Sequence, residues 1–169
     1  VTKTQTVETI NESIACGITH IGENRVQELI EKYDGLTQGV HVHLIGHLQT
    51  NKVRYALPKA ELIHSVDSAH LADEISKTAV SMGITAHALV QVNVSGEESK
   101  FGIPPENLDE LLEHISSLNG IKIHGLMTIP PINDGNIEKS RKVFETLYNI
   151  FIDKQQKKYD NIIMEHLSM

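Results

Sequence analysis

The chain has 169 residues and an ordinary globular composition, with 40% hydrophobic and 22% charged residues. No apolar run reaches the roughly 20 residues that a membrane-spanning helix needs, so we expect one soluble domain with a core of its own. The formal charge of −7 disfavours a nucleic-acid partner, because phosphate binding needs a basic face. Cys16 is the single cysteine and cannot form an internal disulfide, which fits a cytoplasmic protein.

Helix and strand patterns alternate along the chain. The first β-rich stretch is the opening Val1-Thr2, interpreted as the stub of a strand. Apolar residues then recur at helical spacing in residues 5–16, 23–33, 49–57, 69–83, 104–118 and 137–158. Further β-rich runs occupy residues 18–22, 40–46, 61–66, 86–94, 121–129 and 161–169, which makes seven strands in all. Gly17 follows the first helix and predicts a left-handed cap there, and Gly83 ends the helix over residues 69–83.

This alternation, with no hairpin between strands, predicts a parallel sheet with helical crossovers. A doubly wound open sheet is one possibility, but no G-x-G-x-x-G motif follows any strand to support nucleotide binding. The other is an α/β fold of the (β/α)8 TIM barrel type, which needs eight strands and typically ~250 residues. On that interpretation residues 1–169 are a single barrel domain, missing most of strand one and everything after strand seven.

The chemistry of a parallel barrel lies where its strands end. One lysine, Lys3, stands at such a position, and the other strand ends carry small or polar groups. A lysine amine attacks an aldehyde only when it is neutral, so a partly desolvated lysine in the mouth of a barrel is suited to a Schiff base. The alternative is an ordinary solvated lysine near a chain end.

Six motifs, in order, extend the argument across nearly the whole chain. After V-T-K-T come H-I-G-E-N-R-V-Q-E (20–28), H-L-I-G-H-L-Q-T-N-K (43–52), I-H-S-V-D-S (63–68), Q-V-N-V-S-G-E-E-S-K-F-G (91–102), H-G-L-M-T-I-P-P (124–131) and a terminal L-S-M. Together they closely resemble the pyridoxal phosphate homeostasis proteins. Members of that family look like the barrel domain of alanine racemases standing alone.

The resemblance implies a barrel that holds pyridoxal 5'-phosphate (PLP) on Lys3. Asn24 is then expected beside the cofactor ring, Met127 and Ser168 facing the same cavity, and His47 on the rim. Family members are regarded as carriers or regulators of vitamin B6 without an established turnover. The resemblance therefore implies PLP and PLP-dependent apoenzymes as partners, and we expect a cytoplasmic monomer with no membrane or nucleic-acid partner.

Two departures from the family pattern stand out. Gln5 occupies the place of a second lysine in many relatives, which puts any transfer role of that second amine in doubt. The phosphate cradle of the family, and the arginine that faces the pyridine nitrogen, follow the seventh strand. Both are therefore expected beyond Met169.

Two other functions remain open from the sequence. A PLP-dependent amino-acid racemase needs a second proton carrier, usually a tyrosine from another domain. The tyrosines here fall in helices or at their ends: Tyr33, Tyr55, Tyr148 and Tyr159. A metal-dependent barrel hydrolase could use the H-x-H pair His41 and His43, although these begin a strand and such enzymes place ligands at the other end.

Overall fold

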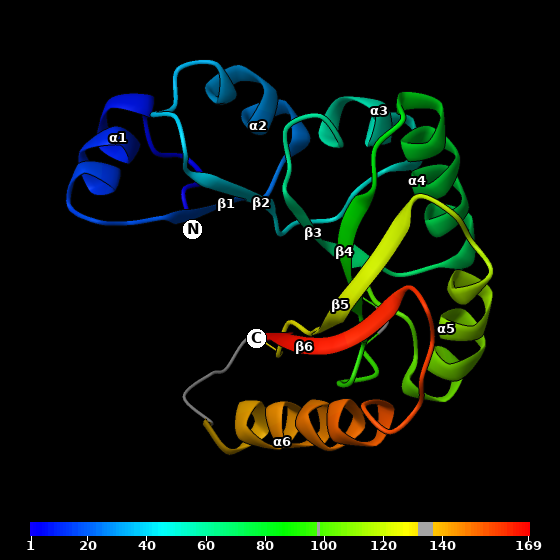
Figure 1. Ribbon diagram of the computed structural model, residues 1–169. Helices are drawn as coiled ribbons and strands as arrows, with labels where there is room; N and C mark the ends of the chain where they lie inside the picture. The colour runs from blue at the N-terminus through cyan, green and yellow to red at the C-terminus, as the bar shows by residue number, and fades with distance from the viewer. Residues whose placement is uncertain (98, 132–136) are drawn as a thin grey trace.

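The computed structural model describes residues 1–97, 99–131 and 137–169. Within these residues six parallel strands form one sheet, in which each strand pairs with the next along the chain. The sheet curves strongly, and the helices lie along its outer, convex face (Figure 1). The strands are β1 (His20–Glu23), β2 (His41–Leu44), β3 (Leu62–Val66), β4 (Ala86–Gln91), β5 (Ile121–Met127) and β6 (Ile162–Ser168).

The helices from α2 onward connect successive strands, as the alternating pattern predicts, and α1 precedes β1. They are α1 (Val7–Ala15), α2 (Val26–Tyr33), η1 (Thr50–Lys52), α3 (Val53–Ala56), α4 (Ala69–Met82), η2 (Pro105–Asn107), α5 (Leu108–Ser116) and α6 (Ile137–Lys154). None of the helices described here is long and apolar enough to cross a membrane.

Local sequence explains where the best-defined helices begin and end. The hydroxyl of Thr6 accepts a hydrogen bond from the Thr9 amide at the start of α1, and Ser68 caps α4 in the same way. Gly83 ends α4 in the left-handed conformation, and Gly17 also has a positive φ after α1, so both predicted glycine positions are confirmed.

Two groups of buried side chains form the core. The larger group lies between strands β2 to β6 and helices α2 to α6. A smaller one joins α1 and α2 to the first two strands, through Ile10, Ile21, Leu29 and Val42. The amino-terminal edge of the sheet therefore has a hydrophobic core of its own.

The predicted first strand is wrong, since Val1-Thr2 forms no strand. The Thr2 amide donates one backbone hydrogen bond to Gly22 O (2.9 Å), but Thr4 then takes a left-handed φ of 63° and turns the chain away. A single hydrogen bond does not make a ladder. In the described residues the sheet consequently has six strands, with β1 and β6 at its edges.

Candidate functional site

The backbone on both sides of Lys3 is fixed to neighbouring elements. The hydroxyl of Thr2 donates to Glu23 Oε1 (2.7 Å), and the amide of Thr4 donates to Glu28 Oε2 (3.0 Å). Lys3 itself is exposed and makes no hydrogen bond or ion pair with any residue that the structure describes. Its amine thus has no partner among the described residues, while the backbone on both sides of it is held beside the end of β1. The expected desolvation of this lysine is absent.

Lys32, on α2, is the centre of this anchoring. Its ammonium group donates to the Thr2 carbonyl (3.0 Å), Glu23 Oε1 (2.9 Å) and Glu28 Oε2 (3.1 Å). Burial by itself would lower the pKa of Lys32, but the hydrogen bonds that its ammonium group donates to the two carboxylates outweigh it and raise that pKa. Lys32 therefore stays charged at neutral pH. We call Thr2, Thr4, Glu23, Glu28 and Lys32 the Lys32 cluster.

Asn24 and His47 line one pocket, as their positions at neighbouring strand ends predict. The pocket has a volume of about 210 Å³ and also includes Lys52. The Asn24 side-chain oxygen is buried without a hydrogen-bond partner. The His47 ring stacks on Phe101 with centroids 3.9 Å apart, and its Nδ1 lies 3.5 Å from a carboxylate oxygen of Asp67. The pocket thus offers an unused amide acceptor and a firmly oriented imidazole.

Gly46 lets the ends of β1 and β2 approach each other at this pocket. A Cβ atom at residue 46 would lie 2.0 Å from the backbone oxygen of Asn24. We expect Gly46→Ala to displace Asn24 and to lower the free energy of unfolding by about 1–3 kcal/mol, the usual cost of overpacking. Urea denaturation measures this change. Gly22→Ala is the control, because its Cβ would meet only the side chain of Ile45, at 3.2 Å; an equal loss in both variants would contradict the steric argument.

Met127 and Ser168 lie side by side at the ends of β5 and β6. Their Cα atoms are register partners in the parallel ladder. Met127 is buried, and the Ser168 hydroxyl is 2.9 Å from Nδ1 of His64, on β3. The structure therefore forms two groups from the predicted residues: Asn24 with His47, and Met127 with Ser168. Lys3 belongs to neither group, and its neighbour Thr2 is bonded to Gly22 and Glu23 of β1.

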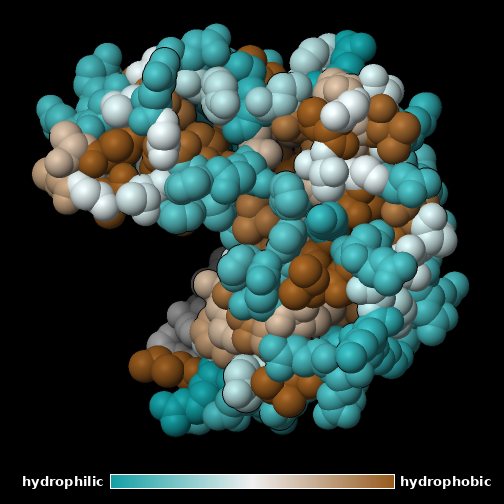
Figure 2. All heavy atoms as spheres, viewed as in Figure 1, coloured by the Kyte–Doolittle hydropathy of each residue, from teal (hydrophilic) through white to brown (hydrophobic). Residues whose placement is uncertain are grey.

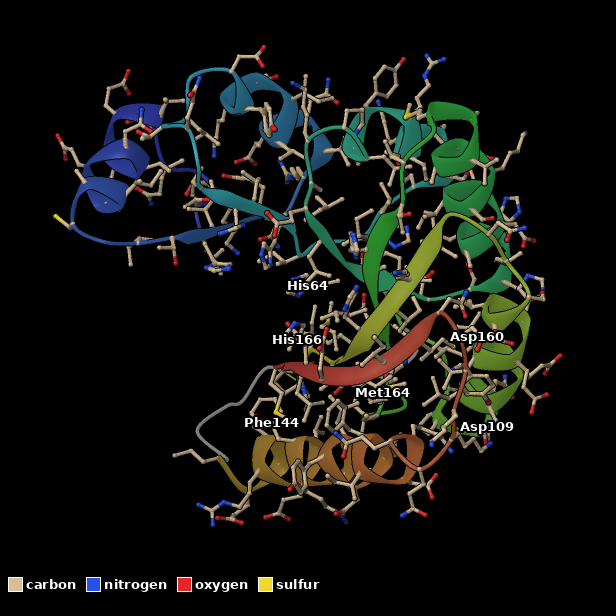
Figure 3. All side chains as sticks on the ribbon, in the orientation of Figure 1. His64, Asp109, Phe144, Asp160, Met164 and His166 are labelled. Atoms are coloured by element: carbon tan, nitrogen blue, oxygen red, sulfur yellow. The ribbon has the colours of Figure 1, made fainter. Side chains whose placement is uncertain are left out.

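The concave face of the sheet carries a set of histidines that the strand-end analysis missed. Figure 3 shows His64 and His166 on this face, in the opening between β3 and β6. The open side is visible as a notch in Figure 2. A hollow of about 280 Å³ is lined by His20, His43, Glu61, Leu62, His87, His124, Glu165 and His166. The signal was present in the sequence, since each of the six strand patterns from residue 18 onward contains a histidine.

These histidines form hydrogen-bonded pairs across neighbouring strands. His43 Nδ1 is 2.9 Å from His64 Nε2, and His87 Nδ1 is 2.7 Å from His124 Nε2. Burial, followed by the nearby charges of His43 and His166, lowers the pKa of His64 to about 4. His64 is therefore a neutral imidazole at physiological pH.

Among the residues described, the histidines form no metal-ligand set of the kind that a metal-dependent hydrolase would need. His41 bonds instead to Glu61 (Nδ1 to Oε2, 2.5 Å), and His43 to His64. Within the described ranges no three His, Cys, Asp or Glu side chains converge to hold a metal ion. The metal hypothesis gains no support from this part of the chain.

Comparisons with known proteins define the class of fold. A family model described as "Alanine racemase, N-terminal domain" matches residues 3–169. An alanine racemase of Clostridium difficile superposes with a TM-score of 0.72 at 17% identity, covering 96% of this chain and 44% of that one. The identity is low, so this second match supports the fold alone.

Closer relatives identify the family. A pyridoxal phosphate homeostasis protein of Aquifex aeolicus is 47% identical over 99% of this chain and 72% of its own length. PipY of Synechococcus elongatus, solved with PLP bound, has a TM-score of 0.88 at 33% identity and covers 99% of this chain and 78% of its own. PipY solved without PLP has a TM-score of 0.91 at 34% identity, with the same coverage. This chain belongs to the pyridoxal phosphate homeostasis protein family.

Proposed function

We propose that this protein binds PLP at the carboxyl ends of its strands, with Lys3 as the covalent anchor, and that it carries or buffers the cofactor as part of vitamin B6 homeostasis. The observation that carries the proposal is the free amine of Lys3 on a backbone fixed by the Lys32 cluster. Lys3 would hold PLP, whose aldehyde would supply the carbonyl that a lysine amine can take up with loss of one water.

The residues around Lys3 fit such a ligand. Asn24, whose amide oxygen is buried without a partner, lines a pocket at the end of β1, the strand to which Thr2 is bonded. A buried acceptor without a partner is costly unless something supplies a donor. Asn24 and the His47 ring, after β1 and β2, are proposed to bind one side of PLP. Met127 and Ser168, at the ends of β5 and β6, are proposed to bind the other side.

We also propose that the complete protein closes into a (β/α)8 barrel. Two strands separate β3 from β6, and neighbouring strands lie about 4.8 Å apart, so a flat sheet would hold β3 and β6 about 14 Å apart. Yet His64 on β3 and Ser168 on β6 are within 2.9 Å across the concave face. This contact supports a curvature close to that of a barrel.

Reduction with borohydride tests the role of Lys3. Because the curated relatives are longer than this chain, the test uses the full-length protein with added PLP. We expect a visible absorption band and, after reduction, a phosphopyridoxyl group on the peptide that contains Lys3. Lys3→Ala should remove both signals, whereas Lys77→Ala, at an exposed lysine on α4, should keep them. A band that persists in Lys3→Ala would refute the assignment.

The carrier role is tested by two further measurements. Full-length protein loaded with PLP should reactivate a PLP-dependent apoenzyme, and it should sediment as a monomer. Stereospecific exchange of the alanine α-proton at enzyme-like rates would instead favour the racemase, for which a tyrosine would have to reach the site.

A further inference from the structure

A continuous chain of hydrogen bonds links the histidine-lined hollow to Ser168. It runs from His43 Nδ1 to His64 Nε2 (2.9 Å), and from His64 Nδ1 to the Ser168 hydroxyl (2.9 Å). The three residues come from β2, β3 and β6, so the chain crosses the concave face of the sheet. His43 lines the hollow, and His64 is only 8% exposed.

The single N–H of a neutral imidazole makes this chain directional. Both ring nitrogens of His64 are in use, one toward His43 and one toward Ser168. A neutral ring donates from one nitrogen and accepts at the other. Either His64 donates to Ser168 and accepts from His43, or Ser168 donates to His64, which then donates to His43.

The two arrangements present different groups at Ser168. When His64 donates from Nδ1, the hydroxyl oxygen accepts that bond and its own hydrogen is free to bond to a ligand. When Ser168 donates to His64, only its lone pairs face outward. An anionic oxygen of a ligand is therefore bound by the first arrangement and repelled by the second.

We propose that His64 is a positioning residue, which orients the Ser168 hydroxyl as a hydrogen-bond donor to an anionic oxygen of bound PLP. This inference rests on the proposed function, because it assumes the ligand, but it assigns a role to a residue that touches no cofactor. It also implies that ligand binding sets the tautomer of His43, which must then donate from Nδ1.

A second chain on the same face provides the matched control. His87 Nδ1 lies 2.7 Å from His124 Nε2, and His124 Nδ1 lies 2.6 Å from Glu165 Oε1. This chain ends on a carboxylate and does not include Ser168. Loss of the His87 imidazole removes the same group from the same face without disturbing the orientation of Ser168.

Tautomer measurement tests the proposal directly. In ¹⁵N-labelled full-length protein with PLP, the imidazole spectrum of His64 should show a protonated Nδ1 and an unprotonated Nε2. Without PLP, Ser168→Ala should already shift the Nδ1 resonance of His64 and leave His87 unchanged. Protonation of His64 at Nε2 in the loaded protein would overturn the proposal.

The affinity of the variants for PLP is the second test of the proposal. We expect His64→Leu and Ser168→Ala each to weaken binding about tenfold, the loss of one hydrogen bond to a charged group, and the double variant to be no weaker than Ser168→Ala. His64→Gln, which can still accept and donate, should bind within about threefold of the wild type, and so should His87→Leu.

The outcomes separate this inference from the proposed function. If wild-type protein binds no PLP, both fail. Two results would refute only the role of His64. One is wild-type affinity for PLP in His64→Leu, and the other is a loss of affinity in the double variant equal to the product of the two single losses. Should His64→Leu fail to fold, the tautomer of wild-type His64 decides alone.

Discussion

Lys32→Met is expected to destabilise the protein by about 3–5 kcal/mol, because it leaves a buried carboxylate without its partner. The side chain of Glu23 is 2% exposed and that of Lys32 is 12% exposed, so water replaces the lost ion pair poorly. The same change removes the bond to the Thr2 carbonyl and loosens the segment that carries Lys3. Urea denaturation measures the stability, and the PLP absorption band reports on Lys3.

Two variants control this experiment. Lys59→Met breaks an ion pair with Asp34, whose side chain is 88% exposed, and should cost at most about 1 kcal/mol. Lys32→Met combined with Glu23→Met removes both buried charges and should recover most of the stability, although not the anchoring of Thr2. If Lys32→Met and Lys59→Met were equally mild, the Lys32 cluster would not be an important source of stability.

Mild acid is expected to destabilise the protein through His64. Its pKa is lowered from 6.5 to about 4 in the folded state, by burial first and then by the charges of His43 and His166. Between pH 4 and pH 6.5, His64 is protonated in the unfolded chain but neutral in the folded chain, so acid favours unfolding. The stability is fully present above pH 6.5 and is lost as the pH falls toward 4. At pH 5 the loss from His64 amounts to about 2 kcal/mol.

Measurement of urea unfolding at pH 7.5 and pH 5 checks this sign. The lowered pKa values of His43 and His87, both dominated by burial, act in the same direction. Exposed carboxylates such as Glu165, whose pKa is lowered by its bond to His124, contribute only at lower pH. His64→Gln keeps a hydrogen-bonding side chain that does not titrate. Its free energy of unfolding should therefore fall less between pH 7.5 and pH 5 than that of the wild type. A variant as acid-sensitive as the wild type would exclude His64 as the cause.

The sequence predicted much of the fold because local patterns dominate a parallel α/β chain. Helical spacing and the glycine after residue 82 located α4, and each predicted strand from residue 18 onward is present within a few residues. The exception is Val1-Thr2, where a β-like composition does not reveal that Thr4 turns the chain away. Positive φ at a threonine depends on the bond from its amide to Glu28, which no local pattern contains.

The candidate site was less predictable, because it depends on contacts between distant residues. Strand-end positions indicated Asn24 and His47, which the structure brings into one pocket. They could not indicate Lys32, which lies in the last turn of α2 and pairs with a buried carboxylate on a neighbouring strand. Nor could they indicate His64, whose bond to Ser168 spans 104 positions and exists only because the sheet curves.

The separate small core beneath α1 and α2 has a consequence for how the protein releases what it carries. Of the partly buried apolar residues, Ala60 alone packs against both cores among the residues described. Helix α1 and strand β1, whose buried residues Ile10 and Ile21 belong to the small core alone, can therefore open as a local unit while the remaining strands stay folded. Such an opening would break the hydrogen bonds that hold Thr2, the neighbour of Lys3, to Gly22 and Glu23. We therefore expect transient fraying at this edge of the sheet to govern how quickly the cofactor exchanges.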